Sequence, residues 1–256
     1  MSLPKISIRQ MFSRAIAFSK ATLKDSENLR LLLVLSLVPI VHWIPIGYFV
    51  EIIKKNPELP LKLEKSKWTK YLEDGFLFLI FRLIYILVVA VIIDVSILVP
   101  LSFLMAISSV RKINLSNDIF SIPIMIIFLI MGTFLFLLLL MGAPAVSVSF
   151  RTGRASKLLA YRELWGMARE IGLLKFFALS IVIFLWWIAD VLILGGGWAG
   201  VYVGLFYLLT LKLEGVFLVL IGPLFLILWL FLGIVFAKVL ALLIDVKYPA
   251  SAYQNV

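Results

Sequence analysis

Long apolar runs alternate with short polar stretches rich in lysine and arginine along most of the chain. The runs that predict membrane segments cover residues 31–53, 76–99, 119–146, 173–194, 198–213 and 215–244. A helix needs about 20 apolar residues to cross the hydrocarbon of a bilayer, and most of these runs are that long. The pattern therefore predicts an all-α fold, a polytopic integral membrane bundle of about six hydrophobic segments that make five or six crossings.

The first 30 residues predict a basic amphipathic helix that is not a membrane span. At about 100° per residue, one arc is apolar and the opposite arc is cationic. The apolar arc holds Ile8, Met11, Phe12, Ala15, Ile16, Phe18 and Leu23, and the cationic arc holds Arg9, Arg14, Lys20 and Lys24. Such a helix is typical of the headgroup plane of an anionic leaflet, and packing on a protein partner is the alternative.

Two further polar stretches, residues 54–75 and 151–172, are predicted to be basic interfacial loops or helices. In the first, Trp68, Tyr71 and Leu72 recur at helical spacing before Gly75. In the second, Leu158, Tyr161, Leu164, Trp165 and Ala168 share one helical face. Three glycines at 195–197 are expected to end the fourth span, because glycine disfavours a helix interior.

The first apolar run contains two prolines, Pro39 and Pro45, on either side of residues 40–44. Each proline removes an amide donor and clashes with the preceding turn, so a kink or two half-helices are expected near His42. One crossing by residues 31–50 fits the bilayer thickness. A segment that re-enters its own side of the membrane is the alternative.

The distribution of charge bears on this alternative. The formal net charge is +10, and six Lys and Arg residues lie in each of three regions, before residue 31, at 54–75 and at 151–175. Six full crossings would divide the cations almost evenly between the two sides, which orients the chain poorly. A re-entrant first run would place all three basic regions on one side, against only Arg111 and Lys112 in the turn at 111–118. This asymmetry favours re-entry in a multi-pass protein of the cell membrane.

Composition excludes several function classes. The chain of 256 residues is 63% hydrophobic and 15% charged, with a mean hydropathy of +1.13, which is far from the composition of a soluble domain. It has no cysteine, which removes thiolate metal sites, iron–sulfur clusters and cysteine nucleophiles. No metalloprotease, nucleophile-elbow or P-loop motif occurs. We therefore expect no enzyme activity, no cofactor, no metal and no nucleic acid.

Ionisable residues within apolar runs are candidate functional groups, because charge is costly inside a membrane. The candidates for an intramembrane polar site are His42, Arg82, Asp94, Asp190 and Lys238. His42 lies about 16 Å along its run, and a neutral imidazole bonded to a carbonyl freed by proline is expected. The candidate contacts to anionic lipid are Arg9, Arg14, Lys20, Lys24, Arg151, Arg154 and Lys157.

Pairs of like residues recur with a spacing of 143 or 144, which is consistent with an internal duplication. Ser36 matches Ser180 and Trp43 matches Trp187, while Glu27 matches Glu170. Each half would then consist of a surface helix followed by apolar segments, and membrane folds are often built this way.

Several short stretches resemble a family of uncharacterised archaeal and bacterial polytopic membrane proteins, of the domain of unknown function 4013 type. The stretches are Pro45–Lys55 (PIGYFVEIIKK), Pro57–Pro60 (PELP), Trp68 with Glu73–Gly75 (EDG), and Ala160–Trp165 (AYRELW). The resemblance implies about six spans, with a Gly-Tyr pair at the end of the first. It assigns no catalytic or binding residue.

These features favour a non-enzymatic membrane protein that organises or accompanies other membrane components. Its basic interfacial helices would bind anionic lipid, a partner membrane protein or a second copy of the chain. The alternative is a small-solute transporter or channel that uses the proline-interrupted first segment and the intramembrane charges.

Overall fold

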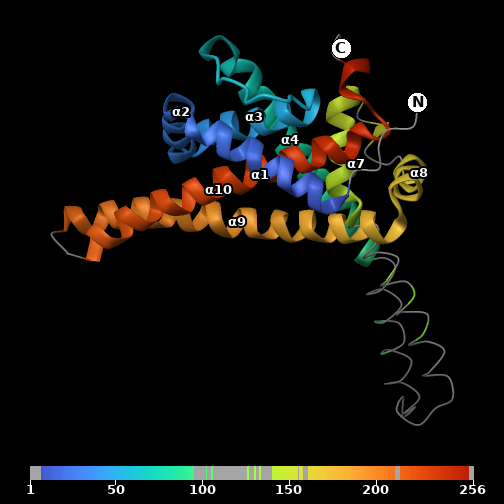
Figure 1. The fold of residues 1–256 in the computed structure, drawn as a ribbon. Helices are drawn as coiled ribbons and strands as arrows, with labels where there is room; N and C mark the ends of the chain where they lie inside the picture. Colours follow the sequence, from blue (N-terminus) through green and yellow to red (C-terminus); the bar gives the residue numbers. More distant parts are fainter. Residues whose placement is uncertain are drawn as a thin grey trace.

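The structure is a computed structural model that describes residues 7–94, 140–154, 156–157, 161–210 and 214–253, with a few isolated positions between 102 and 133. Its helices are α1 (Ile8–Lys24), α2 (Ser26–Leu37), α3 (Trp43–Lys55), α4 (Trp68–Ile93), α7 (Gly142–Thr152), α8 (Tyr161–Ile171), α9 (Leu173–Leu209) and α10 (Glu214–Asp245). Short 3₁₀ turns cover Ile40–His42, Lys65–Lys67 and Ala250–Ala252. The described part contains no strand, so the all-α prediction is confirmed (Figure 1).

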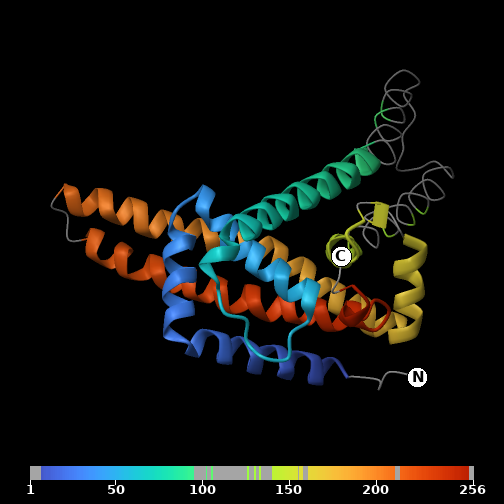
Figure 2. The ribbon, with the colours of Figure 1, turned by 90° about the horizontal axis from the view of Figure 1, so that it is seen from above.

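The two longest helices, α9 and α10, lie side by side as an antiparallel pair (Figures 1 and 2). Their facing glycines let the backbones come close, since a Cβ added at Gly200 would lie 2.8 Å from the Gly222 Cα. Helix α9 runs without interruption for 37 residues, about 55 Å. The predicted boundary between 173–194 and 198–213 at Gly195–Gly197 is therefore wrong, because the helix continues through all three glycines and Gly197 packs closely against Leu226 of α10.

The first apolar run is broken into two helices, as its prolines predict. Helix α2 ends at Leu37, a 3₁₀ turn follows Pro39, and α3 begins at Trp43. The carbonyls at the end of α2 are satisfied by donors from α9, with Trp198 Nε1 bonded to the Ser36 oxygen at 2.8 Å and the Tyr202 hydroxyl to Leu37 at 2.6 Å.

After α3 the chain returns to the point where α2 starts. The Asn28 side chain, in the first turn of α2, donates to the Leu61 carbonyl at 2.9 Å and accepts from the Leu63 amide at 2.8 Å. The Tyr48 hydroxyl donates to the same Leu61 carbonyl at 2.8 Å. Leu61 and Leu63 thus lie beside the start of α2, and the first apolar run forms two separate helices that differ from a single straight crossing of 31–53.

Local residues explain where the early helices begin and end. Ser7 and Gln10 exchange side-chain and backbone hydrogen bonds at the start of α1, which forms a capping box. The Asp25 carboxylate accepts from the Glu27 and Asn28 amides and begins α2. Asn56 adopts a left-handed conformation with φ 43°, which ends α3 and starts the loop that returns to α2.

Helices α3 and α4 cross at two glycines. A Cβ on Gly47 would lie 1.8 Å from the Tyr71 carbonyl oxygen, and one on Gly75 would lie 2.0 Å from that of Trp43. Helix α4 begins at Trp68 and passes through Gly75, so only residues 56–67 of the predicted interfacial stretch 54–75 lie between helices. The end of the predicted segment 76–99 lies outside the described residues.

Helix α1 covers residues 8–24 of the 30 predicted and has the expected amphipathic pattern, and its apolar face packs on α10. Met11, Ala15 and Phe18 are buried, and the Ser19 hydroxyl donates to the Phe231 carbonyl at 3.1 Å. Figure 2 shows α1 alongside the half of α10 that ends at Asp245. Part of the apolar face therefore contacts the protein's own last helix, as in the protein-packed alternative, while Ile16 stays 37% exposed.

The second half departs from prediction near residue 150. Helix α7 continues to Thr152 and buries every residue from Gly142, so Arg151 belongs to the protein interior and not to an interfacial loop. Most of the predicted segment 119–146 lies outside the described residues. Helix α8 is amphipathic as expected and buries Leu164, Met167 and Ala168. The two halves that the proposed duplication would relate have different structures, because α9 is one continuous helix where the first half has the separate helices α2 and α3.

Among the described residues, two helices are long and apolar enough to cross a membrane, over Leu173–Leu209 and Leu218–Asp245. The predicted segment 215–244 matches α10 closely. This finding supports an association with membrane, and it covers two of the five or six predicted crossings.

The α3–α4 crossing generates a stability prediction. We expect Gly47→Ala to lower the free energy of unfolding by about 3 kcal/mol or more, because the methyl group meets backbone that cannot rotate away. Gly195→Ala is the matched control, since nothing lies within 4 Å of its Cβ position. Thermal unfolding in detergent would measure both, and equal midpoints for the two variants would contradict the close crossing.

Candidate functional site

Polar side chains gather in three places within the helical body. We call them the Arg82 cluster (Arg82, Trp187, Asp190 and Trp229), the Arg151 cluster (Ile53, Arg151, Ala241, Asp245 and Tyr248) and the Lys238 groove, defined below. Three of the predicted intramembrane residues, Arg82, Asp190 and Lys238, take part in them.

The Arg82 cluster joins α4 to α9 and α10. Arg82 Nη1 lies 2.8 Å from Asp190 Oδ2 in an ion pair with both side chains less than a fifth exposed. The other guanidinium nitrogen donates to the Trp187 carbonyl, and the indole of Trp229 donates to Asp190. The guanidinium carbon lies 4.9 Å from the centre of the Trp187 ring. The two predicted charges thus form one satisfied pair.

A small cavity adjoins this pair. It has a volume of about 50 Å³ and is lined mainly by apolar side chains, among them Phe49, Trp186 and Phe236. A space of this size holds a few water molecules and lies well below the volume of a small-molecule site. The cluster is built for packing and charge neutralisation.

His42 and Asp94 lie apart from this ion pair. His42 Nδ1 lies 3.2 Å from the Pro39 carbonyl oxygen, and its ring meets the Trp198 ring edge-on at 4.8 Å between centroids. The imidazole contacts a backbone carbonyl as expected, and this carbonyl belongs to Pro39 itself. Asp94 is exposed about 18 Å along α4 from Arg82, so the structure does not bring the five candidates into one site.

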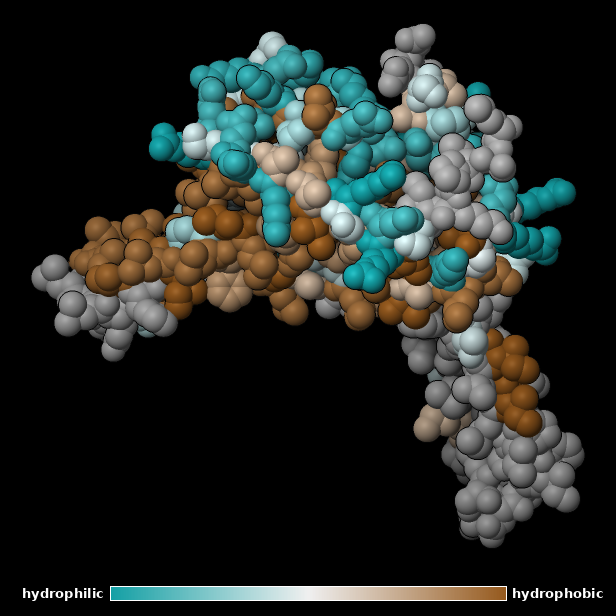
Figure 3. All heavy atoms as spheres, in the orientation of Figure 1, coloured by the Kyte–Doolittle hydropathy of each residue, from teal (hydrophilic) through white to brown (hydrophobic). Residues whose placement is uncertain are grey.

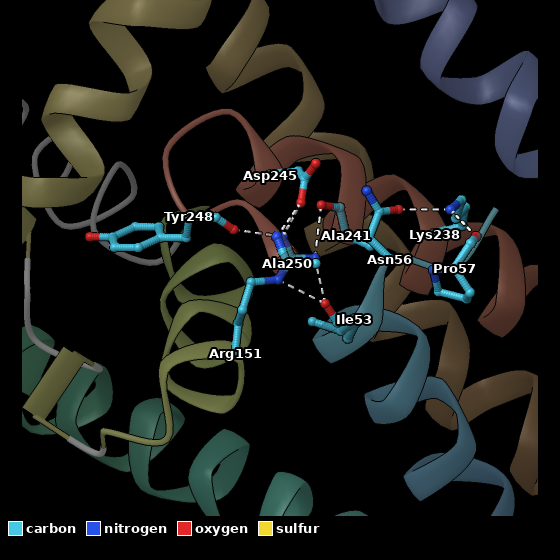
Figure 4. A network of polar contacts seen from close by, with 9 residues as sticks. All are labelled: Ile53, Asn56, Pro57, Arg151, Lys238, Ala241, Asp245, Tyr248 and Ala250. Atoms are coloured by element: carbon cyan, nitrogen blue, oxygen red, sulfur yellow. Dashed lines mark hydrogen bonds and ion pairs between the residues drawn. The ribbon is translucent and has the colours of Figure 1, made fainter. Parts of the chain in front are cut away.

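The Arg151 cluster ties the ends of three helices together (Figure 4). The Arg151 side chain is 0% exposed and donates to the carbonyls of Ile53, Ala241 and Tyr248, the last at 2.9 Å. It also lies 2.8 Å from Asp245 Oδ1, an oxygen that accepts from the Ala250 amide as well. The expected contact of Arg151 with lipid is therefore wrong, because every face of the guanidinium is occupied by protein.

Burial and hydrogen bonds shift the pKa values of two groups at this end of the protein. Burial lowers the pKa of the Arg151 guanidinium to about 10, while the Asp245 carboxylate acts in the opposite sense. The group remains charged at neutral pH. Near the end of the cluster, hydrogen bonds from Lys157 and then Tyr248 lower the pKa of Glu163. Lys157 is thus occupied by an ion pair with Glu163, whereas Arg154 is exposed.

The Lys238 groove lies between α1, α10, residues 55–60 and the C-terminal residues 249–251. Its volume is about 790 Å³. The Lys238 ammonium donates to the Asn56 amide oxygen at 2.7 Å and to the Pro57 carbonyl, both labelled in Figure 4. It also lies 5.0 Å from the centre of the Phe18 ring. Sequence reasoning found Lys238 but not the groove, since its partners lie more than 180 residues away.

Four predicted lipid contacts, Arg9, Arg14, Lys20 and Lys24, are exposed on α1. None of them forms an ion pair with another described residue. Arg9 and Lys20 line a shallow depression of about 510 Å³ together with Phe12 and Ile16. Cations and apolar side chains therefore share the outer surface of this helix. Within the described ranges, no group of three His, Asp or Glu side chains is placed to hold a metal ion.

Comparison with known proteins gives one match. The model of a family described as "Protein of unknown function (DUF4013)" matches residues 31–197. No curated protein and no solved structure matches the chain significantly. The matched region contains α3, α4, α7 and α8 with most of α2 and α9, including Arg82, Arg151 and Asp190.

The Arg82 cluster generates a double-mutant prediction. We expect Arg82→Met or Asp190→Asn alone to lower the free energy of unfolding by about 3 kcal/mol, because each leaves a buried partner unsatisfied. The double variant should lose less than the sum of the two. Denaturation in mixed micelles would measure the cycle, with the exposed Glu64–Lys67 pair as a control expected to contribute under about 1 kcal/mol. Additive losses at the buried pair would contradict the direct interaction.

Proposed function

The chain belongs to the DUF4013 family of proteins of unknown function, and from this premise we propose that it is a multi-pass membrane protein that binds anionic lipid headgroups through α1. It acts as an organising or accessory component of the cell membrane and catalyses no reaction. Partner membrane proteins or a second copy would assemble on the same lipid-associated face.

The surface supports a membrane setting. Figure 3 shows hydrophobic residues along the α9–α10 pair and hydrophilic residues over the elements above it. Large apolar side chains are exposed on both of these helices, namely Leu192, Tyr202, Val203, Leu205, Phe206 and Leu209 on α9 and Val216, Leu220, Leu224, Phe225 and Leu228 on α10. Soluble proteins rarely expose an apolar surface of this extent, because contact with water is unfavourable. Hydrocarbon is the solvent that fits it.

The observation that carries the proposal is the position of the four exposed α1 cations. They lie on a helix that packs directly on α10, one of the two helices able to cross a membrane. Each Lys or Arg near an anionic surface contributes about 1 kcal/mol, so four of them favour anionic over neutral membranes by roughly a thousand-fold. Exposed ion pairs within the protein would reduce this effect, and these four residues form none with the described residues.

The geometry favours lipid binding over solute transport. The intramembrane charges Arg82 and Asp190 neutralise each other, and the cavity beside them has room for water only. His42 is bonded to a backbone carbonyl and packed on Trp198.

Lipid selectivity tests the proposal. We expect the triple variant Arg9→Gln, Lys20→Gln, Lys24→Gln to bind phosphatidylglycerol about 100-fold more weakly than the parent chain in mixed micelles, because three headgroup interactions are lost. Binding of phosphatidylcholine should not change, and the effect should shrink in high salt. The preference would be read from the titration of a fluorescent lipid of each class.

A charge-matched control separates α1 from charge in general. Lys62, Lys65 and Lys70 are also exposed, and their triple substitution by glutamine removes the same charge from the 56–67 loop and the start of α4. We expect only a small loss for this control. Equal losses in the two triple variants, or no loss in either, would overturn the assignment of lipid binding to α1.

A further inference from the structure

The Lys238 groove combines a buried positive charge with apolar walls. Lys238 is 6% exposed, although it lies within α10, the second of the apolar helices. An ammonium has three N–H donors, and two of them go to carbonyl oxygens of Asn56 and Pro57. These acceptors are neutral, and no carboxylate of a described residue lies within 4.0 Å of the Lys238 nitrogen. The positive charge is therefore solvated by dipoles and left without a counter-ion.

The other charged groups of the groove do not neutralise Lys238. Asp245 is held by Arg151 and by the Ala250 amide. Lys55 is paired with Glu51 at 2.6 Å. Glu58 and Arg14 remain as exposed groups of opposite sign. After these pairings the groove keeps one excess positive charge, and that charge is Lys238, the buried one.

The remaining walls are suited to a molecule with an apolar part. Ala17, Phe18 and Ala21 of α1 face Leu242 of α10 across the groove, and Leu59 closes one side. A volume of about 790 Å³ lies in the range of small-molecule binding sites. Lys238 lies seven residues before the end of α10 at Asp245, about 10 Å along the helix axis, so a headgroup phosphate beside this end of the helix would be within reach of its side chain.

We propose that the Lys238 groove binds one anionic phosphate headgroup, with Lys238 as the buried charge partner and Arg14 as the contact at the rim. The inference rests on the proposed function and names one discrete site, in addition to the diffuse attraction of the outer α1 cations. The phosphate belongs to an anionic phospholipid whose first acyl carbons lie along the apolar walls. Free phosphate shares the same charge chemistry and lacks the apolar contacts.

Native mass spectrometry of the full chain, titrated with phosphatidylglycerol in detergent, tests the site. We expect the parent chain to retain one lipid more tightly than all others. The variant Lys238→Met, which keeps the length of the side chain, should bind this lipid at least ten-fold more weakly, and Lys238→Arg should restore most of the affinity. Lys62→Met removes an exposed cation outside the groove and should have no effect.

A second variant covers the case in which Lys238→Met does not fold. Arg14→Gln alters an exposed residue and should lower the affinity for the first lipid several-fold with no loss of stability. An unchanged affinity for the first lipid in every folded variant of Lys238 and Arg14 would overturn the proposal. Competition with inorganic phosphate identifies the source, because displacement of the lipid by millimolar phosphate assigns the site to the free anion, and resistance assigns it to the phospholipid.

The α1 triple variant separates this inference from the proposed function. It leaves Arg14 and Lys238 intact, so it should keep the first tight lipid and lose the weaker additional ones. If the triple variant loses the additional lipids while Lys238→Met binds the first lipid normally, the groove proposal fails and the role of the outer α1 cations stands. If Lys238→Met loses the first lipid while the triple variant keeps its full preference for anionic lipid, the groove proposal stands. The proposed role of the outer α1 cations then fails.

Discussion

The buried Arg151 side chain sets the relation between the ends of three helices. It lies in the last turn of α7 and donates to Ile53 near the end of α3 and to Ala241 near the end of α10. Carbonyls at helix ends carry partial negative charge and lack partners within the helix, so one guanidinium with five donors satisfies several of them. Asp245 completes the charge balance at 2.8 Å. Helices α3, α7 and α10 must therefore end on the same side of the body.

The Asn28 hydrogen bonds and the packing of α1 on α10 extend this arrangement to the basic regions. Asn28 binds the loop after α3 to the start of α2, and α1 packs along α10 through Phe18 and its neighbours. The cations of α1, of residues 54–67 and of the α7–α8 region then share one side, while the apolar α9–α10 pair extends away from it (Figure 3). A re-entrant first segment, which the charge asymmetry favours, stays the prediction for this arrangement in a membrane. The same arrangement forms the Lys238 groove, since α1, the loop and α10 meet there.

The sequence predicts features that depend on neighbouring residues. Amphipathic α1, the break near His42 and the extent of α10 follow from helical periodicity and from proline, which act within a few turns. It does not predict features that depend on distant partners. Gly197 lies inside a helix and packs against Leu226 of α10, and Arg82 meets Asp190 across 108 residues. The sequence suggests that Arg151 is a surface cation, because its partners are mostly backbone carbonyls. Every residue has such a carbonyl, so the sequence does not reveal which ones Arg151 binds.

The sidedness of the basic regions is the central claim, and cysteine labelling measures it directly because the chain has no native cysteine. Single substitutions Ser13→Cys, Ser66→Cys, Ser156→Cys and Ser251→Cys place thiols at exposed positions on α1, the loop before α4, the α7–α8 connection and the C-terminal turn. With an impermeant maleimide on intact cells and on inverted vesicles, all four should react from the same side. Reaction of Ser13→Cys and Ser66→Cys from opposite sides would contradict the re-entrant segment and the shared cationic face.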